Sequence, residues 1–360
     1  MSQGPGLFYG VMEAKGAYNR HARIPVGGAA LAVPFLEKAA RQITLDDQDR
    51  PVVIADYGSS QCKNSLVPIA IAIRNVRPRL HSDRPIFVFH VDQPSNDFNS
   101  LFDVLSSDPD RYSLDEPNVF PCAIGRSFYE QVLPSASVHL GWCSYAAVWL
   151  RRVPCLIPGH FFPAFSTGAT RAAFHQQAAE DWVTFLSCRA SEMRPGARLV
   201  VVLPNLPKDG PRGFAKMMND ANALLQEMVD GGAITVEERA QMAVGGYMRS
   251  KDDLFAPFVA ESRFQGLTIE DYEVSMLPDP AWADFERTGD KEAMAVKNAL
   301  FFRAVFMPSL ADSLTRVRSG DSEALGTFAD RLQDGLARRL AIEPTPMDMS
   351  VQTIVFAKSG

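Results

Sequence analysis

The sequence lacks the features that mark membrane-spanning, secreted and nucleic-acid-binding proteins. No stretch approaches about 18 consecutive apolar residues, and the first residues do not form a charged segment followed by an apolar one, so neither a spanning helix nor a secretion signal is predicted. The chain has no basic run and its formal net charge is −6, so it lacks the positive surface that binding to phosphate groups requires. We therefore expect a cytoplasmic protein with no membrane and no nucleic-acid partner.

Cysteine pairs and common nucleotide-binding motifs are also missing. The five cysteines include no C-x-x-C pair. An odd number of scattered cysteines is typical of free thiols in a reducing compartment, so neither a metal site nor a disulfide framework is predicted. Neither G-x-G-x-x-G nor G-x-x-x-x-G-K-S/T occurs, which removes the main support for a dinucleotide or nucleoside triphosphate site. The apolar content of 46% and charged content of 22% are typical of a globular enzyme.

Five short apolar runs rich in branched residues predict buried strands of a parallel sheet. They span residues 51–56, 86–92, 119–124, 137–142 and 198–203, and helical patterns between them span residues 64–75, 99–106, 145–152 and 172–193. This alternation predicts an α/β fold with a doubly wound sheet. Two later strand patterns, 267–277 and 349–358, flank a helical stretch over 291–317. They predict that the mostly parallel sheet ends in an antiparallel last strand.

Residues 204–254 have a wholly helical pattern. Apolar residues recur there at helical spacing, which indicates a buried helix face rather than methionines that grip a ligand. They are Phe214, Met217, Met218, Ala221, Leu224, Leu225 and Met228. Thr235 followed by Glu238 predicts a capping box at the start of the next helix. We interpret residues 206–261 as an inserted helical cap over the active site of a domain formed by 30–205 and 262–360, with residues 1–29 closing the pocket.

Two acidic residues follow predicted strands. Asp56 and Gly58 come directly after the first strand, where open α/β sheets bind nucleotides beyond the carboxyl ends of their strands. A carboxylate there suits a cofactor with a cationic amino-acid group, and a generic turn explains the same residues. Asp92 ends the second strand, where its two oxygens can accept both hydroxyls of a ribose or cap a turn.

The residues that follow resemble the signature of a known family. Asp92-x-Pro94-x-Asn96-Asp97-Phe98-Asn99 is similar to the N-D-x-P-x-N-D-F-N stretch of the SABATH methyltransferases, the salicylic acid, benzoic acid and theobromine methyltransferases. Further matches follow in the same order: residues 54–64 resemble A-D-L-G-C-S-S-G-P-N, residues 127–129 resemble G-S-F-Y, and residues 144–154 resemble S-S-Y-S-L-x-W-L-S-x-V-P. Several separated matches in order are far more specific than any one of them.

The resemblance implies a Rossmann-like methyltransferase fold that binds S-adenosyl-L-methionine (SAM) and releases S-adenosyl-L-homocysteine (SAH). The cofactor-binding residues that it implies are Asn19, His21, Asp56, Gly58, Ser60, Asn64, Asp92, Gln93, Ser127 and Phe128. Asp56 and Asn64 would face the methionine part, and Asp92 would hold the ribose. His21 is included among the cofactor-binding residues because residues 19–22 align without gaps to the family's N-S-Y-A, in which the tyrosine contacts the cofactor. An exposed histidine is the alternative at that position.

The resemblance assigns Trp149 to the substrate, because the matching family tryptophan presents its indole N–H to the substrate carboxylate. Without it, a tryptophan four residues after Tyr145 on a helix is more typical of a core residue. Tyr145 and Trp142 would be neighbouring wall residues. The family's second carboxylate contact, a glutamine, falls at Gly28 here, so the carboxylate would be held from one side unless a nearby arginine or a cap residue substitutes.

These residues predict an O-methyltransferase that forms the methyl ester of a small aromatic or apolar carboxylic acid by in-line transfer. A carboxylic acid with a pKa of about 4 is already ionised at neutral pH, so no general base is needed and no catalytic residue is assigned. One alternative is an N-methyltransferase acting on a heterocycle, since the family includes purine alkaloid enzymes. A non-catalytic SAM-binding protein is another, suggested by the changed residues 61–63. The resemblance also implies a homodimer.

Overall fold

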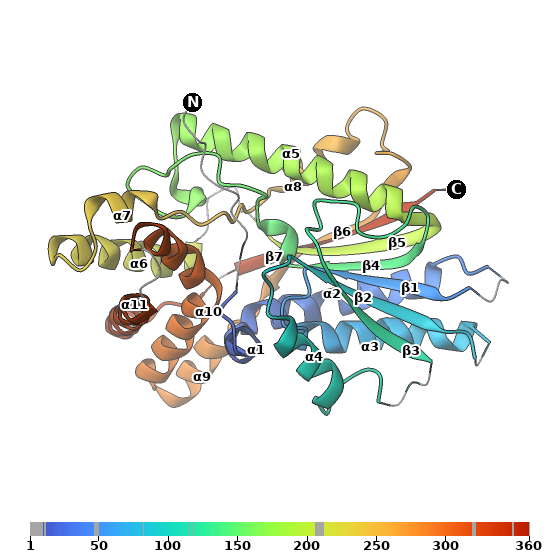
Figure 1. Ribbon diagram of the computed structural model, residues 1–360, viewed down its shortest axis with the longest axis horizontal. Coiled ribbons are helices and arrows are strands. Elements are labelled where there is room, and N and C mark those ends of the chain that lie inside the picture. The colour runs from blue at the N-terminus through green and yellow to red at the C-terminus, as the bar shows by residue number, and fades with distance from the viewer. Residues whose placement is uncertain are drawn as a thin grey trace.

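The computed structural model describes residues 10, 12–46, 50–81, 83–114, 116, 118–205, 212–318, 322–347 and 349–359. Residues 1–9 and 11 of the predicted closing segment and residues 206–211 of the predicted cap lie outside the described residues. The described chain forms a seven-stranded sheet with the strand order β3-β2-β1-β4-β5-β7-β6. Helices cover both faces of this sheet (Figure 1).

The sheet is mixed in strand direction. Its strands are β1 (Val52–Tyr57), β2 (Ile86–Asp92), β3 (Val119–Gly125), β4 (Val138–Ser144), β5 (Met193–Pro204), β6 (Leu267–Leu277) and β7 (Met349–Lys358). β1 to β5 are parallel, β7 is antiparallel to β5, and β6 is antiparallel to β7. The predicted α/β class, with a mostly parallel sheet and an antiparallel last strand, is confirmed. Central strands are apolar along their length because helices bury them from both sides.

The two faces of the sheet carry separate apolar clusters. The helices on the sheet are α2 (Arg23–Gln42), α3 (Leu66–Val76), α4 (Phe98–Ser107) and α5 (Gly168–Glu192). On one face, Leu36, Ile69 and Leu101 join α2, α3 and α4 to the strands. Helix α5 covers the opposite face (Figure 1). Its Trp182 and Phe185 pack there in a second cluster. Burial of each such side chain stabilises the fold by about 1.5–3 kcal/mol. The two clusters therefore fix the helices against the sheet on both of its faces.

A layer of helices lies beside the sheet (Figure 1). The remaining helices are α1 (Ala17–His21), α6 (Arg212–Asp230), α7 (Val236–Gln241), α8 (Lys251–Phe255), α9 (Pro280–Thr288), α10 (Lys291–Arg318) and α11 (Ser322–Ile342). Met218 of α6 is buried in one cluster with Phe302 of α10 and Leu332 of α11, so the methionines of α6 are core residues as predicted. The predicted capping box is present, with Thr235 and Glu238 bonded reciprocally.

The sequence patterns do not predict α2, α9 or α11, which complete the helical layers. Helices α10 and α11 pack against α6, so the helical layer is formed by residues outside 206–261 as well as by residues within that range. The predicted division into domains stays a prediction. None of the described helices is both long and apolar enough to cross a membrane.

The predicted helix over residues 145–152 is wrong. Tyr145 has a left-handed conformation with φ 60°, only a 3-10 turn follows at Ala146–Val148, and Trp149 is extended. The Leu150 N–H donates to the carbonyl of Gly245 at 2.7 Å, and Trp149 forms an antiparallel bridge with Gly246. Pairing with this distant segment satisfies the backbone groups that a helix would have satisfied locally, so tertiary structure overrides the helical pattern.

Candidate functional site

A polar cavity lies beyond the carboxyl ends of β1, β2 and β4. Its volume is about 120 Å³. It is lined by Gly10, Met12, Ala14, Tyr18, Gly58, Ser60, Asp92, Gln93, Ser95, Asn96, Asp97, Ser127, Phe128, Tyr129, Ser144, Tyr145, Ala146, Trp149 and Leu150. The structure therefore brings together eight of the predicted residues: Gly58, Ser60, Asp92, Gln93, Ser127, Phe128, Tyr145 and Trp149. This is the position at which open α/β sheets bind nucleotides.

Asp92 is, with Asp97, one of two acidic residues in the described wall of this cavity. Its Oδ2 accepts a hydrogen bond from the backbone N–H of Ser60 at 2.7 Å, and its Oδ1 accepts one from the backbone N–H of Gln93 at 2.8 Å. Burial, with a smaller contribution from the nearby Asp56, raises the pKa of Asp92 to about 6, although the two backbone donors act to lower it. The carboxylate is thus oriented by the backbone and ionised at neutral pH. Each oxygen keeps a lone pair for another donor.

Several polar atoms around the cavity have no hydrogen-bond partner. Within the described part of the chain, they are Ser60 Oγ, Gln93 Oε1, Ser144 Oγ and Tyr145 OH. A buried polar group without a partner costs about 1–3 kcal/mol, so four of them around one cavity indicate that a polar ligand completes the site. A ligand carrying a ribose, an adenine and an amino-acid group offers donors and acceptors of this kind.

The N-terminal segment lies across the cofactor-side loops. Gln61 Nε2 donates to the carbonyl of Glu13 at 2.8 Å, and the Lys15 backbone N–H donates to Asp97 Oδ2 at 2.9 Å. Glu13 is also tied to α10, because its carboxylate pairs with Arg303 at 3.0 Å. These contacts hold Met12 and Ala14 in the cavity wall.

Gly58 is required by a close approach at the end of β1. It has φ 84°, and a Cβ on it would lie 2.0 Å from the Cβ of Ala146. We expect Gly58→Ala to lower the free energy of unfolding by about 2–4 kcal/mol, because the overpacked contact adds to the backbone strain. Urea unfolding measures this. Gly159→Ala is the matched control, since Gly159 has φ 75° and no heavy atom within 4 Å of an added Cβ; equal losses in both variants would contradict the contact.

The loop that carries Ser127 and Phe128 is held from beneath by a buried ion pair. Arg189 and Glu192 are both fully buried near the end of α5 and pair at 2.8 Å. Arg189 donates to the backbone carbonyl of Phe128, and to that of Glu130 at 2.9 Å. The guanidinium thus bonds directly to the backbone of a residue that lines the cavity.

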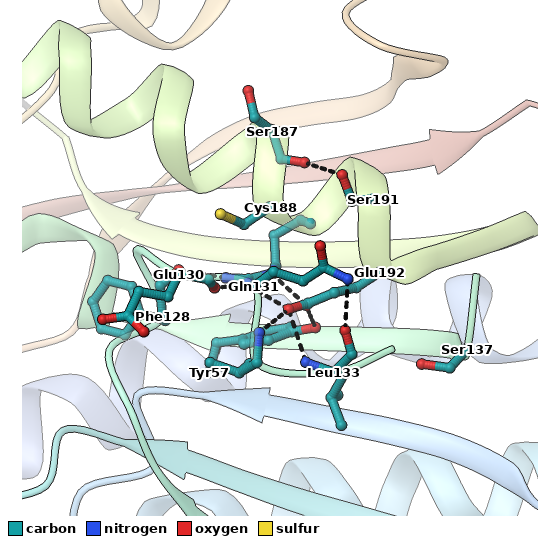
Figure 2. Close-up of polar contacts among 12 residues, drawn as sticks. Tyr57, Phe128, Glu130, Gln131, Leu133, Ser137, Ser187, Cys188, Ser191 and Glu192 are labelled. Atoms are coloured by element: carbon teal, nitrogen blue, oxygen red, sulfur yellow. Dashed lines mark hydrogen bonds and ion pairs between the residues drawn. The ribbon is translucent and has the colours of Figure 1, made fainter. Parts of the chain in front are cut away.

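Glu192 completes this network (Figure 2). Its Oε1 accepts from the backbone N–H of Val132 at 2.6 Å and of Leu133 at 3.1 Å, and its Oε2 accepts from the Tyr57 hydroxyl at 2.7 Å. Tyr57 precedes Gly58 at the end of β1. The network therefore connects α5, the end of β1 and the loop of Phe128, and its satisfied hydrogen bonds compensate for burying two charges. Sequence patterns do not reveal it, because four of the groups that Arg189 and Glu192 bind are backbone groups: the carbonyls of Phe128 and Glu130 and the N–H groups of Val132 and Leu133.

A second, apolar cavity of about 70 Å³ adjoins the first. It is lined by Met12, Tyr18, Ile24, Pro25, Tyr145, Val148, Trp149, Phe162, Pro204, Phe214, Gly246, Met248, Phe301, Val305, Phe306 and Met349. Four residues line both cavities: Met12, Tyr18, Tyr145 and Trp149. The boundary between the polar and the apolar chamber is thus formed by Met12 and three aromatic side chains, and Tyr145 and Trp149 are two of the three predicted substrate residues.

Asp56 lies beneath the polar cavity rather than in its wall. Its Oδ2 is 2.8 Å from Nδ1 of His90, and both side chains are buried. His90 Nε2 is 2.8 Å from the Tyr112 hydroxyl. Burial lowers the pKa of His90, but Cys62, Tyr112 and Asp56 together outweigh it and hold that pKa well above its usual value. One oxygen of the Asp56 carboxylate is therefore engaged by His90, and the predicted contact of Asp56 with the cofactor stays a prediction.

Four more predicted residues are absent from the described cavity walls: Trp142, Asn19, Asn64 and His21. Trp142 is buried within β4, where it packs in the cluster under α2 and α3, so it is a core residue. Asn19 donates to the carbonyl of Gln61 at 3.2 Å, and the Asn64 side chain contacts the hydroxyl of Tyr18. Their predicted cofactor contacts, and that of His21, stay predictions.

Tyr18 is a cavity residue that the sequence comparison misses. It lies one helical turn before His21 on α1 and lines both cavities. A shift of three residues in the alignment brings Tyr18 onto the family tyrosine that the gap-free alignment gives to His21. The same shift moves the family glutamine from Gly28 to Pro25, which lines the apolar cavity. Neither residue has a side chain that donates a hydrogen bond.

The sheet order, the polar site at its strand ends and the adjoining apolar chamber define a Rossmann-like methyltransferase. The sequence matches the family model described as SAM dependent carboxyl methyltransferase over residues 12–318. The chain belongs to this family, which uses SAM as its cofactor.

Named relatives lie in fungi and plants. The chain is 28% identical over 249 residues to "Methyltransferase LUC1" of Fusarium sp, an alignment covering 68% of this chain and 65% of that protein. It is 30% identical over 250 residues to loganic acid O-methyltransferase of Catharanthus roseus, covering 65% and 64%. It is 29% identical over 276 residues to salicylate carboxymethyltransferase of Clarkia breweri, covering 72% and 74%. The chain thus spans just under two thirds of the first two relatives.

A solved structure has the same fold. The structure of loganic acid methyltransferase with SAH superimposes with a TM-score of 0.75 at 23% sequence identity, covering 97% of this chain and 99% of that one.

Proposed function

We propose that this chain is an O-methyltransferase that transfers the methyl group of SAM to the carboxylate of a small organic acid and releases a methyl ester and SAH. The observation that carries the proposal is the pair of cavities that meet at Tyr18, Tyr145 and Trp149. One chamber has the charge and the unpartnered polar atoms that a nucleoside needs. The other has the apolar wall that suits the body of an organic acid.

The polar cavity fits SAM. Asp92 would hold the ribose, because it is ionised and oriented by two backbone N–H groups. Phe128 would pack on the adenine, with Ser127 and Gln93 beside it. The cofactor supplies a methyl group on a sulfonium, which is a good leaving group without further activation.

The residues of this chain have to align the acceptor rather than activate it. An ionised carboxylate is already a nucleophile at neutral pH, so no proton has to be removed. Alignment of a bound acceptor with the methyl carbon accounts for a large share of the rate that such a site achieves. The aromatic residues at the boundary between the cavities would exclude water from the space between the acceptor oxygen and the methyl carbon. The names of relatives, which include salicylate and loganic acid enzymes, support an acid as acceptor.

The test is a turnover assay with the purified protein, methyl-labelled SAM and panels of carboxylic acids and xanthines. We expect labelled methyl ester and SAH in equal amounts with at least one acid. Transfer to a xanthine nitrogen and to no acid would identify an N-methyltransferase. Calorimetric binding of SAM without turnover on any acceptor would identify a SAM-binding protein. Either result would overturn the proposal.

Cofactor affinity is expected to depend on pH through Asp92. The ionised carboxylate accepts hydrogen bonds from ribose hydroxyls and the protonated one loses this capacity, so SAM binds the ionised form. Because the pKa is raised to about 6, the dissociation constant should stay flat above that value and rise by up to about tenfold per unit as the pH falls below it. Calorimetric titration between about pH 5 and pH 8 measures this. Asp92→Asn should remove the dependence, and a persisting slope in that variant would assign it to another group.

A further inference from the structure

We propose that His90 is a positioning residue for the cofactor that acts through Asp56: by bonding one oxygen of that carboxylate, it keeps a negative charge at the end of β1 for the ammonium group of SAM and SAH. The inference goes beyond the methyl transfer itself. It takes up the predicted contact between Asp56 and the methionine part of the cofactor, and it names the residue on which that contact depends.

His90 and Asp56 are neighbours in the sheet. They are register partners in the parallel strands β1 and β2, so their side chains project from the same face. His90 Nδ1 is 2.8 Å from Asp56 Oδ2, and Nε2 is 2.8 Å from the Tyr112 hydroxyl. Because a carboxylate oxygen accepts, Nδ1 carries the proton of the first bond. Both ring nitrogens are held, so the imidazole and the carboxylate that it bonds have a fixed orientation.

This polar pair lies in an otherwise apolar layer. His90 is 0% exposed and Asp56 is 2% exposed. Ile54 and Val88, which precede them by two residues on the same strands, belong to the apolar cluster under α2 and α3. Cys62 Sγ contacts the imidazole at 3.7 and 3.8 Å from its two nitrogens. A polar pair costs free energy in such a layer, where apolar side chains would serve the fold as well. The pair therefore points to a role at the adjoining cavity.

Asp56 acts on the polar cavity from beneath. It comes two residues before Gly58, which lines that cavity. Burial and, to a smaller extent, the charge of Asp56 raise the pKa of Asp92 in the cavity wall. The Asp56 carboxylate is thus felt electrostatically where the cofactor would bind. Two neighbouring carboxylates favour a ligand with a positive charge, and both SAM and SAH have an ammonium group.

The loop that follows Asp56 has further acceptors for such a group. Within the described part of the chain, the buried oxygens Ser59 Oγ and Gln61 Oε1 have no hydrogen-bond partner. An ammonium group has three N–H donors. Unpartnered oxygens beside a buried carboxylate, on one short stretch of chain, indicate that a cationic donor completes this part of the site.

Two ligands that differ in the amino-acid group test the inference. SAH has this group, whereas 5′-methylthioadenosine has the same adenine, ribose and sulfur with a methyl group in its place. In His90→Leu, the buried Asp56 carboxylate loses the donor that favours its charge. We expect the dissociation constant of SAH to rise by about 10-fold or more, as for loss of a hydrogen bond to a charged group. That of methylthioadenosine should change by less than about 2-fold. Calorimetry measures both.

The selectivity between the two ligands separates positioning from support of the fold. An equal weakening of SAH and methylthioadenosine would mean that His90 only supports the fold, and no change in either would mean that it has no role at the site. Each of these results would overturn the inference. His139→Leu is the matched control, because His139 is also buried but contacts Val53 and Arg194 at the amino-terminal ends of β1 and β4. It should leave the ratio of the two dissociation constants unchanged.

His90→Asn is the conservative variant. Its side-chain amide has a donor that can replace Nδ1 in the bond to Asp56. We therefore expect it to restore SAH binding to within about 3-fold of the unaltered protein. If the asparagine variant bound SAH as weakly as the leucine variant, the bond to Asp56 would not be the cause, and the inference would fail.

A double variant shows whether His90 acts through Asp56. We expect Asp56→Asn to weaken SAH selectively, and adding His90→Leu to it should change SAH binding by less than about 2-fold further. Both of these variants lack the buried carboxylate charge, so they provide the test even if His90→Leu alone does not fold. Additive losses would contradict action through Asp56.

Failure of this inference is distinct from failure of the proposed function. SAH binding is measured without any acceptor, so its dependence on His90 stands or falls whether or not an acid is esterified. Turnover of an acid with unchanged SAH binding in His90→Leu would refute the inference alone. Selective loss of SAH binding in that variant, with no acid esterified by the unaltered protein, would refute the proposed function alone.

Discussion

Replacing Asp92 with alanine is expected to weaken SAM binding by at least about 100-fold, because two hydrogen bonds from the ribose to a charged acceptor contribute about 1.5–3 kcal/mol each. The fold should tolerate the change, because Asp92 lines the cavity and its two partners within the protein are the backbone N–H groups of Ser60 and Gln93. Both of these residues line the same cavity, where water can bind the N–H groups in the variant. Calorimetry gives the dissociation constant, and urea unfolding checks the fold.

Two variants calibrate this result. Asp92→Asn keeps one acceptor oxygen and the size of the side chain, so its affinity should lie between those of the wild-type and alanine proteins. Asp103→Ala removes an exposed carboxylate from the neighbouring α4 and should leave affinity unchanged. Undiminished uptake of SAM by Asp92→Ala would mean that the cofactor is held elsewhere, and the assignment of the polar cavity would fall.

The second large effect concerns Arg189. Its replacement by methionine leaves the Glu192 carboxylate buried without its cation and leaves the carbonyls of Phe128 and Glu130 without a donor. We expect the free energy of unfolding to fall by about 3–5 kcal/mol, as for other buried pairs broken at one partner. Urea unfolding measures this.

Arg126→Met is the matched control, because Arg126 pairs with Glu130 in the same loop but at the surface, with both side chains more than half exposed. That variant should lose no more than about 1 kcal/mol. Because the Arg189 network holds Phe128, Arg189→Met should also weaken SAM binding in conditions where it remains folded. A destabilisation equal to that of Arg126→Met would contradict the role of the network.

The fold follows from the sequence to a large extent because its signals are local. Each central strand is a short apolar run between turn residues, and α5 and α10 have long helical patterns, so their limits are predicted to within a few residues. α2 escapes prediction because alanine, glycine and an internal proline blur its pattern. Residues 145–152 are mispredicted because Leu150 pairs with Gly245, a partner that no local window contains.

The site divides in the same way. Asp92 was within reach of sequence reasoning because a polar residue after a buried strand of a parallel sheet lies at the ligand-binding edge. Ser127 and Phe128 were implied only by the resemblance of residues 127–129 to the family's G-S-F-Y. Asp56 has an equivalent position in sequence, but it pairs with His90 of the adjacent strand and is not among the residues that line the polar cavity. Trp142 and Trp149 look alike in sequence, and only packing separates the core residue from the boundary residue.

By itself, the sequence determined the α/β class, the edge of the sheet at which a ligand binds and the family to which the chain belongs, because strand periodicity and ordered motifs are properties of neighbouring residues. Only the tertiary structure decided that Tyr18 rather than His21 lines the cavities, that Gly28 makes room for the Tyr145 phenol, and that Arg189 supports the loop of Phe128. Those contacts join residues far apart in the chain. Their energies come from close packing and from hydrogen bonds to backbone groups, and every residue type has the same backbone, so a sequence pattern cannot reveal them.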